Sequence, residues 1–235
     1  MKKIVILSIL ALSFKVGFSQ NTQTFFDQAD AFFKKHVSNG RVDYKAIKSS
    51  QNELNELLTL ANSISVSKSN ANEYKAFWIN AYNLGVIKGI IDIYPTKTPL
   101  VDGFFDKTKH SLGGKKIILN DIENKLLRAE FDDARFHFVL VCGALGCPPL
   151  INEAYRPATL DAQLTRQTKL ALNNSNFIKV KKNKVEVSEI LKWYKEDFVK
   201  KGQSEIDFIN KYRTEKIPAK SRLGYYTYNW TLNSK

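Results

Sequence analysis

The 235-residue chain has little cysteine and methionine, with Cys142, Cys147 and a single methionine. The C-x4-C spacing does not support a thioredoxin-type redox motif, which needs C-x2-C. Gly-rich phosphate loops and the G-x-S-x-G motif of serine hydrolases are also missing. His110, His137 and the two cysteines have no recognised zinc-binding spacing. We therefore expect neither a metal nor a cofactor.

The sequence has no long hydrophobic run after its N-terminus. Residues 4–14 form an apolar stretch behind a basic start, and Gly17-Phe18-Ser19 supplies small residues before a cut. This pattern predicts a secretory signal peptide over residues 1–19, because the stretch is too short for a membrane anchor and Lys15 interrupts it. No later segment reaches about 18 uninterrupted apolar residues. We expect residues 20–235 to form a single exported domain, periplasmic or secreted, without a transmembrane segment.

Positive charge is concentrated in the last third of the chain. Residues 20–162 hold 17 Lys and Arg against 16 Asp and Glu, whereas residues 163–235 hold 16 against 7. Lys181 and Lys182 belong to this excess. In an exported protein a basic surface suits an anionic envelope surface or acidic glycan better than nucleic acid, so we expect no nucleic-acid partner. A solvated lysine-rich face is the plainer alternative.

Helical periodicity dominates the first half, and it is strongest in residues 72–94. This stretch is apolar on both faces and ends at Pro95, which predicts a central, buried helix with Trp78 and Tyr82 in the core. Spacing and capping residues predict further helices over about 22–37, 44–61, 121–130, 159–173 and 188–200, and from 204 onward. Strands are predicted over 115–119, 136–142, 177–180, 185–187 and 224–232.

The order of these elements predicts the fold class. N-terminal helices come first, and mixed helices and strands follow, which is typical of α+β proteins. We expect the central helix to pack on a small, mainly antiparallel sheet, with further helices around it. Asn80 and Asn83 lie three apart on one face of that helix and need partners, because each buried unsatisfied amide costs about 1–3 kcal/mol. They either hold neighbouring loop backbone, or one of them orients a catalytic group or binds a carbonyl oxygen.

The chemically richest stretch is 135–150, RFHFVLVCGALGCPPL. Its apolar run 136–141 predicts a buried strand that leads into a small-residue loop. His137 and Cys142 would face opposite sides of an unbroken strand, so a Cys–His pair needs a bulge or turn, which Gly143 allows. A thiolate nucleophile needs such a base nearby. Alternatively, Cys142 and Cys147 form a disulfide, as close cysteines of exported proteins commonly do.

Five motifs occur in order along the chain: FWINAYNLGVIKGI, LNDIENKLLR, HFVLVCGALGCPPL, EILKWYKEDF and YTYNWTLN. Together they resemble the domain-of-unknown-function 547 family, from about Gly40 to Leu232. Asn124 and Asn229 depart from the family pattern, which often has histidine and aspartate there. The resemblance implies the domain but no established reaction. Positions that match its motif residues are Trp78, Asn80, Tyr82, Asn83, Glu123, Arg128, His137, Cys142, Cys147, Tyr194 and Asp197.

Two functions are compatible with these residues. The first is a cysteine-dependent hydrolase or acyl/amide transferase of the cell envelope, acting on a small-molecule, peptide or glycan substrate. Cys142 is the predicted nucleophile, with Cys147 as the alternative; His137 is the predicted base, and Asn80 or Asn83 orients it or polarises the substrate. Trp78, Tyr82 and Arg128 are the predicted binding residues.

The second function is a non-catalytic binding domain. Here a Cys142–Cys147 disulfide staples the loop, and a basic face that includes Lys181 and Lys182 binds an anionic envelope partner.

Overall fold

The computed structural model describes residues 21–235, so the predicted signal peptide lies outside the described residues. Residues 21–36 are helical, and a small hairpin of β1 (Val37–Ser38) and β2 (Arg41–Val42) follows. The predicted helix over 44–61 is two helices, α2 (Tyr44–Ser49) and α3 (Asn52–Ser63). Ser50 is extended between them. The break falls in a run of serine, glutamine and asparagine, and serine and asparagine side chains compete with helical backbone hydrogen bonds.

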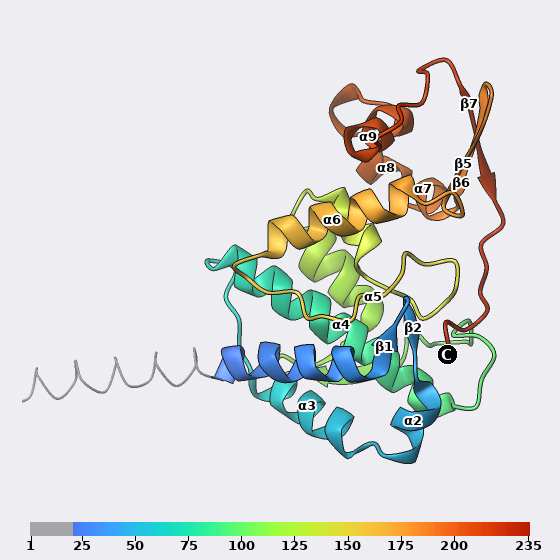
Figure 1. Ribbon diagram of the computed structural model, residues 1–235. Helices are drawn as coiled ribbons and strands as arrows, with labels where there is room; N and C mark the ends of the chain where they lie inside the picture. Colours follow the sequence, from blue (N-terminus) through green and yellow to red (C-terminus); the bar gives the residue numbers. More distant parts are fainter. Residues whose placement is uncertain (1–20) are drawn as a thin grey trace, which may run out of the picture.

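The central helix is α4 (Ala71–Ile93), and it is buried on all sides, as predicted. The helix over residues 21–36 lies on one side of α4 and α6 (Leu160–Asn173) lies on the other (Figure 1). Trp78 and Tyr82 are buried in the core. Tyr94 leaves the helix in an extended conformation, and Pro95 prevents its continuation.

A long loop after α4 leads to an antiparallel hairpin, which consists of β3 (Lys109–Leu112) and β4 (Lys115–Ile118). The next helix begins two residues earlier than predicted, as α5 (Leu119–Asp121), so Asn120 lies inside it. The helix then widens to the π-helical η1 (Ile122–Arg128). π-helical turns are rare and occur frequently at functional sites.

The predicted strand over 136–142 is wrong. Residues 134–138 form a 3-10 helix, η2 (Ala134–Phe138), and the chain is irregular from there to Pro149. The Asp133 carboxylate accepts a hydrogen bond from the Arg135 N–H and starts this tight turn. Phe136 and Val141 are buried nonetheless. The apolar run therefore predicted burial correctly and backbone conformation incorrectly, and α4 does not pack on a sheet at this place.

The C-terminal part forms a three-stranded sheet in the order β5 (Ile178–Lys181), β6 (Lys184–Ser188), β7 (Arg222–Tyr226). The predicted strands over 177–180 and 185–187 are confirmed as the antiparallel pair β5 and β6. The final strand starts and ends earlier than predicted and runs parallel to β6. The predicted helix over 188–200 is interrupted at Tyr194, which separates α7 (Ile190–Trp193) from α8 (Lys195–Phe198). The 3-10 turn η3 (Lys200–Gly202) and helix α9 (Glu205–Tyr212) follow.

These elements give an α+β fold, as predicted, with two hydrophobic clusters. One is built around α4, and the other lies between α6, the three-stranded sheet and α7 to α9 (Figure 1). Cys147 contacts both clusters, so the loop that carries it lies where they meet. Within residues 21–235, none of the helices is both long and apolar enough to cross a membrane.

Candidate functional site

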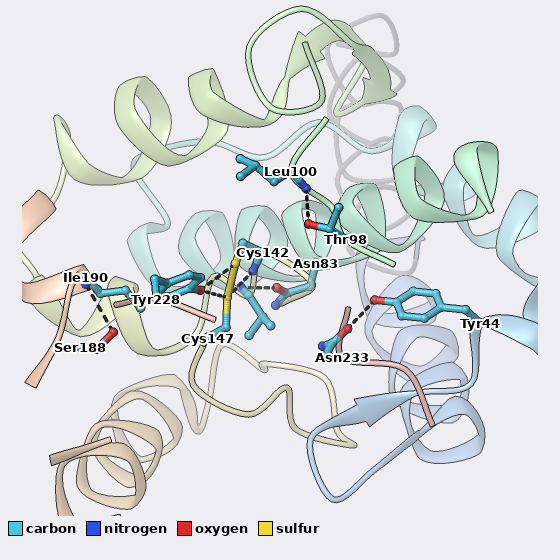
Figure 2. Close-up of a disulfide and its surroundings, with 11 residues drawn as sticks. Tyr44, Asn83, Thr98, Leu100, Cys142, Cys147, Ser188, Ile190, Tyr228 and Asn233 are labelled. Carbon is cyan, nitrogen blue, oxygen red and sulfur yellow. Dashed lines mark hydrogen bonds between the residues drawn. A yellow bond between two sulfur atoms is a disulfide. The ribbon is translucent and has the colours of Figure 1, made fainter. Parts of the chain in front are cut away.

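Cys142 and Cys147 form a disulfide, with their Cα atoms 6.4 Å apart (Figure 2). Of the two alternatives that the sequence leaves open, the disulfide is the one in the structure. The Tyr228 hydroxyl donates a hydrogen bond to Cys147 Sγ at 2.8 Å and lies 3.0 Å from Cys142 Sγ. The Cys142 N–H also donates to Cys147 Sγ, at 3.0 Å. Both cysteines are half-buried.

His137 faces acidic groups. Its Nε2 lies 2.7 Å from Asp197 Oδ2, and its Nδ1 lies 4.0 Å from Glu123 Oε1. The imidazole stacks on the ring of Tyr194, with centroids 4.0 Å apart. Among the described residues, neither sulfur is a hydrogen-bond partner of His137. The predicted Cys–His pair is thus not assembled in the disulfide state.

Arg128 and His137 share the same carboxylate. Arg128 Nε donates to Asp197 Oδ2 at 2.7 Å, and its guanidinium lies over the ring of Tyr194. Burial disfavours the charge of Asp197, but hydrogen bonds from His137 and Arg128 outweigh burial and hold the pKa of this carboxyl well below its usual range. Arg128 also donates to Asn124 Oδ1. Asn124, where the family pattern often has histidine, therefore supports the arginine.

A cavity of about 300 Å³ lies between α4 and the C-terminal elements. At its mouth Trp193 is 46% exposed, and its ring centroid lies 4.9 Å from that of Tyr228 and 6.0 Å from that of Trp230. We call this cavity the aromatic cleft. Its lining residues are Tyr82, Phe105, Asn120, Glu123, His137, Leu140, Cys142, Cys147, Ile190, Trp193, Tyr194, Tyr228 and Trp230.

Glu123 supplies the carboxylate of the aromatic cleft and is itself buried. Burial chiefly, and then the neighbouring Glu123 carboxylate, raise the pKa values of the Tyr82 and Tyr194 hydroxyls far above their ordinary range. Both hydroxyls therefore stay protonated at neutral pH and serve as hydrogen-bond donors beside Glu123. The cleft combines donors, one carboxylate, one imidazole and a disulfide inside an aromatic wall.

Residues 66–170 match the family model described as "Protein of unknown function, DUF547". The chain resembles this family. We call residues 66–170 the DUF547 segment. It carries α4, η1, η2 and both cysteines, and the match confirms the predicted resemblance over these residues. The motifs EILKWYKEDF and YTYNWTLN lie beyond the match. No curated protein and no solved structure matches the chain.

The aromatic cleft combines residues from both parts of the chain. The DUF547 segment contributes Tyr82, Glu123, His137 and the disulfide, whereas the C-terminal part contributes the tryptophans, Tyr194 and Tyr228. Sequence reasoning placed Tyr194 and Asp197 among the positions that match the family, but it missed Trp193, Tyr228 and Trp230 as site residues. Their signal was present as the aromatic clusters WY at 193–194 and YYTYNW at 225–230.

The two asparagines of α4 hold loop backbone, the plainer of the predicted alternatives. Asn83 Nδ2 donates to the Val139 carbonyl at 3.0 Å, and Asn83 Oδ1 accepts from the Val141 N–H at 2.9 Å. Asn80 makes the same pair of bonds to the backbone of Tyr155, at 2.8 and 3.0 Å. The Asn83 side chain therefore approaches the disulfide loop, as expected, and it bonds to the backbone of that loop (Figure 2).

The other predicted binding residues lie outside the lining of the aromatic cleft. Trp78 is buried in the core of the DUF547 segment, against Phe77 and beneath Gly113. Lys181 and Lys182 are exposed at the turn between β5 and β6. Arg128 reaches the site through Asp197. Across residues 21–235, no three His, Cys, Asp or Glu side chains are arranged to hold a metal ion.

Proposed function

We propose that the protein binds a small organic cation in the aromatic cleft. The observation that carries this proposal is the lining itself. Six aromatic rings line the cavity together with Glu123, and among the described residues no lysine or arginine lines it. Aromatic faces attract cations, and recognition of quaternary ammonium groups commonly uses such cages.

The distribution of charge supports a cationic ligand. The charge of Asp197 is already matched by Arg128 at 2.7 Å. Within the described part of the chain, Glu123 forms no salt bridge with arginine or lysine and lies 4.0 Å from His137 Nδ1 instead. A ligand ammonium placed among the rings thus meets a carboxylate that lacks a direct salt bridge to arginine or lysine, in a partly desolvated setting where a cation–π contact contributes about 0.5–2 kcal/mol.

The size of the cleft indicates a small ligand. A volume of about 300 Å³ lies at the lower end of the range for small-molecule pockets, about 300–1,000 Å³. The Cys142–Cys147 disulfide forms part of the wall and fixes the loop beside the ligand. This arrangement fits the predicted stapled binding domain, with the recognition surface moved from the basic face to the cleft.

Isothermal titration calorimetry with choline and its neutral isostere, 3,3-dimethyl-1-butanol, tests the proposal. We expect choline to bind about tenfold more tightly than the isostere, and Glu123→Gln to remove that preference. Trp230→Leu should weaken choline binding. Glu205→Gln is the matched control, because Glu205 is equally buried but hydrogen-bonds Tyr225 outside the cleft. Equal affinities for choline and the isostere in the wild type would contradict the proposal.

A second candidate is the cysteine-dependent hydrolase or acyl/amide transferase, active when the disulfide is reduced. Its support is that both cysteines and His137 line one cavity, while Asp197 holds the Nε2 side of the imidazole. With Nε2 held by Asp197, Nδ1 is left for a proton transfer. Iodoacetamide labelling of the reduced protein tests it. His137→Gln should slow labelling of Cys142 at neutral pH, and an unchanged rate argues against a Cys–His pair.

We also propose export and contact with an anionic envelope surface, as the sequence predicts. Support comes from the apolar N-terminal run and from the exposed Lys181 and Lys182. N-terminal sequencing of the mature protein should start at Gln20. Binding to phosphatidylglycerol vesicles should decrease in the Lys181→Glu/Lys182→Glu variant. Unchanged vesicle binding would show that the basic turn is only a solvated surface.

A further inference from the structure

The two sulfurs of the disulfide differ in their surroundings. Cys147 Sγ accepts hydrogen bonds from the Tyr228 hydroxyl and from the Cys142 N–H, at 2.8 and 3.0 Å. Among the residues that the structure describes, Cys142 Sγ has only the same Tyr228 oxygen as a partner, at 3.0 Å. A hydroxyl has one proton, and the shorter distance gives it to Cys147. The donors are therefore collected on one sulfur.

We propose that this disulfide is a site of thiol–disulfide exchange with a small thiol, in which Cys142 is attacked and Cys147 leaves. Both residues are half-buried in the wall of the aromatic cleft, so a thiol that enters the cleft reaches the sulfurs without unfolding of the loop. This activity goes beyond cation binding and does not depend on it.

The donors on Cys147 select it as the leaving sulfur. Exchange proceeds by thiolate attack on one sulfur while the other departs as a thiolate, and stabilisation of the departing thiolate speeds the reaction. Hydrogen bonds to a charged acceptor are about twice as strong as those to a neutral one. The two hydrogen bonds to Cys147 Sγ therefore become stronger as negative charge develops on this sulfur. Burial raises the pKa of Tyr228, which keeps its hydroxyl protonated and able to donate.

Tyr228 is fixed in place for this role before any reaction. Its N–H donates to Glu189 Oε2 at 2.9 Å. Its ring lies directly over Gly146, where a Cβ would come within 2.8 Å of a ring carbon. The segment that follows Tyr228 is bound to the disulfide loop, since Gly146 N–H donates to the Asn229 carbonyl and Leu145 N–H to the Thr231 carbonyl, both at 2.8 Å. The hydroxyl is therefore preorganised at the sulfurs (Figure 2).

The exchange balances with two equivalents of thiol. A thiolate R–S⁻ attacks Cys142 Sγ, so that the R–S–Sγ bond forms, the Sγ–Sγ bond breaks and the electron pair goes to Cys147. A second thiolate attacks the R sulfur and releases Cys142 as a thiolate. The products are R–S–S–R and the two protein thiols, which take up the protons that the two thiols lost. The incoming thiol is oxidised and the protein disulfide is reduced.

The first test uses the oxidised wild-type protein and 2-mercaptoethanol as the probe. After a short reaction in native buffer and an acid quench, fragmentation mass spectrometry locates the mixed disulfide. We expect the adduct on Cys142. An adduct mainly on Cys147, or one that forms only in guanidinium chloride, would overturn the proposal and leave the disulfide as a structural staple.

The second test removes the hydroxyl. Tyr228→Phe should slow reduction by 2-mercaptoethanol about tenfold, because one hydrogen bond to the developing thiolate is lost. Tyr226→Phe is the matched control, since its hydroxyl donates to the Phe177 carbonyl away from the sulfurs. Equal rates in wild type and Tyr228→Phe would contradict the role of Tyr228. The wild-type adduct map does not depend on the folding of either variant, so it decides the site of attack in any case.

Discussion

Helix α4 and the segment over residues 134–147, which we call the disulfide segment, are both apolar and buried. They differ in how their backbone N–H and C=O groups find hydrogen-bond partners. The helix pairs its own N–H and C=O groups. The disulfide segment pairs only some of its own groups, and the Val139 carbonyl and Val141 N–H bond to the Asn83 side chain instead. A regular element is thus self-sufficient, whereas an irregular buried segment depends on side chains supplied by its neighbours.

The two regions also differ in the kind of polar group that they bury. The buried amides of α4, on Asn80 and Asn83, do not titrate, and burial raises the pKa of its Tyr82 hydroxyl far above the ordinary range. The disulfide segment buries His137 against Asp197, whose other partner is Arg128. Between neutral and acid pH, the disulfide segment should therefore respond to protonation of its partner Asp197, whereas the inner groups of α4 should not.

The largest expected effect comes from α4. Trp78→Ala should lower the free energy of unfolding by about 4 kcal/mol, because it removes a fully packed indole and leaves a cavity. Urea denaturation measures it. Trp193→Ala is the control, since that side chain is 46% exposed and its loss should cost about 1 kcal/mol or less. Similar losses in the two variants would contradict the view of α4 as the core of the fold.

Asn83→Ala and Asn80→Ala form a matched pair that separates stability from the site. Each removes two hydrogen bonds to a buried loop, so each should cost about 3 kcal/mol. Only Asn83→Ala should also raise hydrogen exchange at Val141 and speed reduction of the disulfide. If Asn80→Ala changes those two readouts equally, the dependence of the disulfide segment on Asn83 is not specific.

The sequence predicted α4 almost to the residue because burial on all faces, length and Pro95 all indicate the same structure. For the disulfide segment, one hydrophobic run was compatible with a strand, and nothing local showed that its partners would be Asn83 and Tyr228. Those partners lie 56 and 86 residues away from the atoms that they contact. Such pairings are properties of the folded chain, which is why the site was predicted only in its DUF547 part.

The asparagines and His137 also show that the sequence does not reveal contacts between residues far apart along the chain. Sequence reasoning recognised that buried amides need partners, and both have them. It placed His137 near a cysteine because the two are close in sequence. In the structure His137 bonds Asp197, a residue 60 positions away. Sequence proximity therefore identified the residues of the cleft better than it identified their pairings.

Gly143 tests whether the disulfide segment tolerates a side chain against α4. Its φ is +82°, and an added Cβ would lie 2.5 Å from Ile90 Cδ1. Gly143→Ala should cost about 2 kcal/mol, from left-handed backbone strain and overpacking together. Gly114→Ala is the control with similar backbone strain but open space, since its φ is +71° and the nearest atom is 3.9 Å away. Thermal denaturation should show a clearly smaller loss of stability for Gly114→Ala. Equal losses of stability would show that overpacking against Ile90 contributes nothing.

The smallest expected effect is a change in the acid dependence of stability. The pKa of Asp197 is lower in the folded protein than its unfolded value of about 3.9. A carboxyl with a lowered pKa contributes stability above the unfolded value, and this contribution is lost as pH falls through the folded value. Between pH 6 and pH 3 the wild type should therefore lose about 1 kcal/mol through this group, after allowance for solvent screening.

Asp197→Asn should reduce that slope, whatever its effect at neutral pH, because asparagine does not titrate. Urea denaturation of both proteins at pH 6 and pH 3 measures the difference. Asp102→Asn is the control, since its carboxylate is 90% exposed and pairs with Lys107 at the surface. The acid slope of this variant should match the wild type. If Asp197→Asn keeps the full slope, the pairing of Asp197 with His137 and Arg128 is not what makes the disulfide segment sensitive to acid.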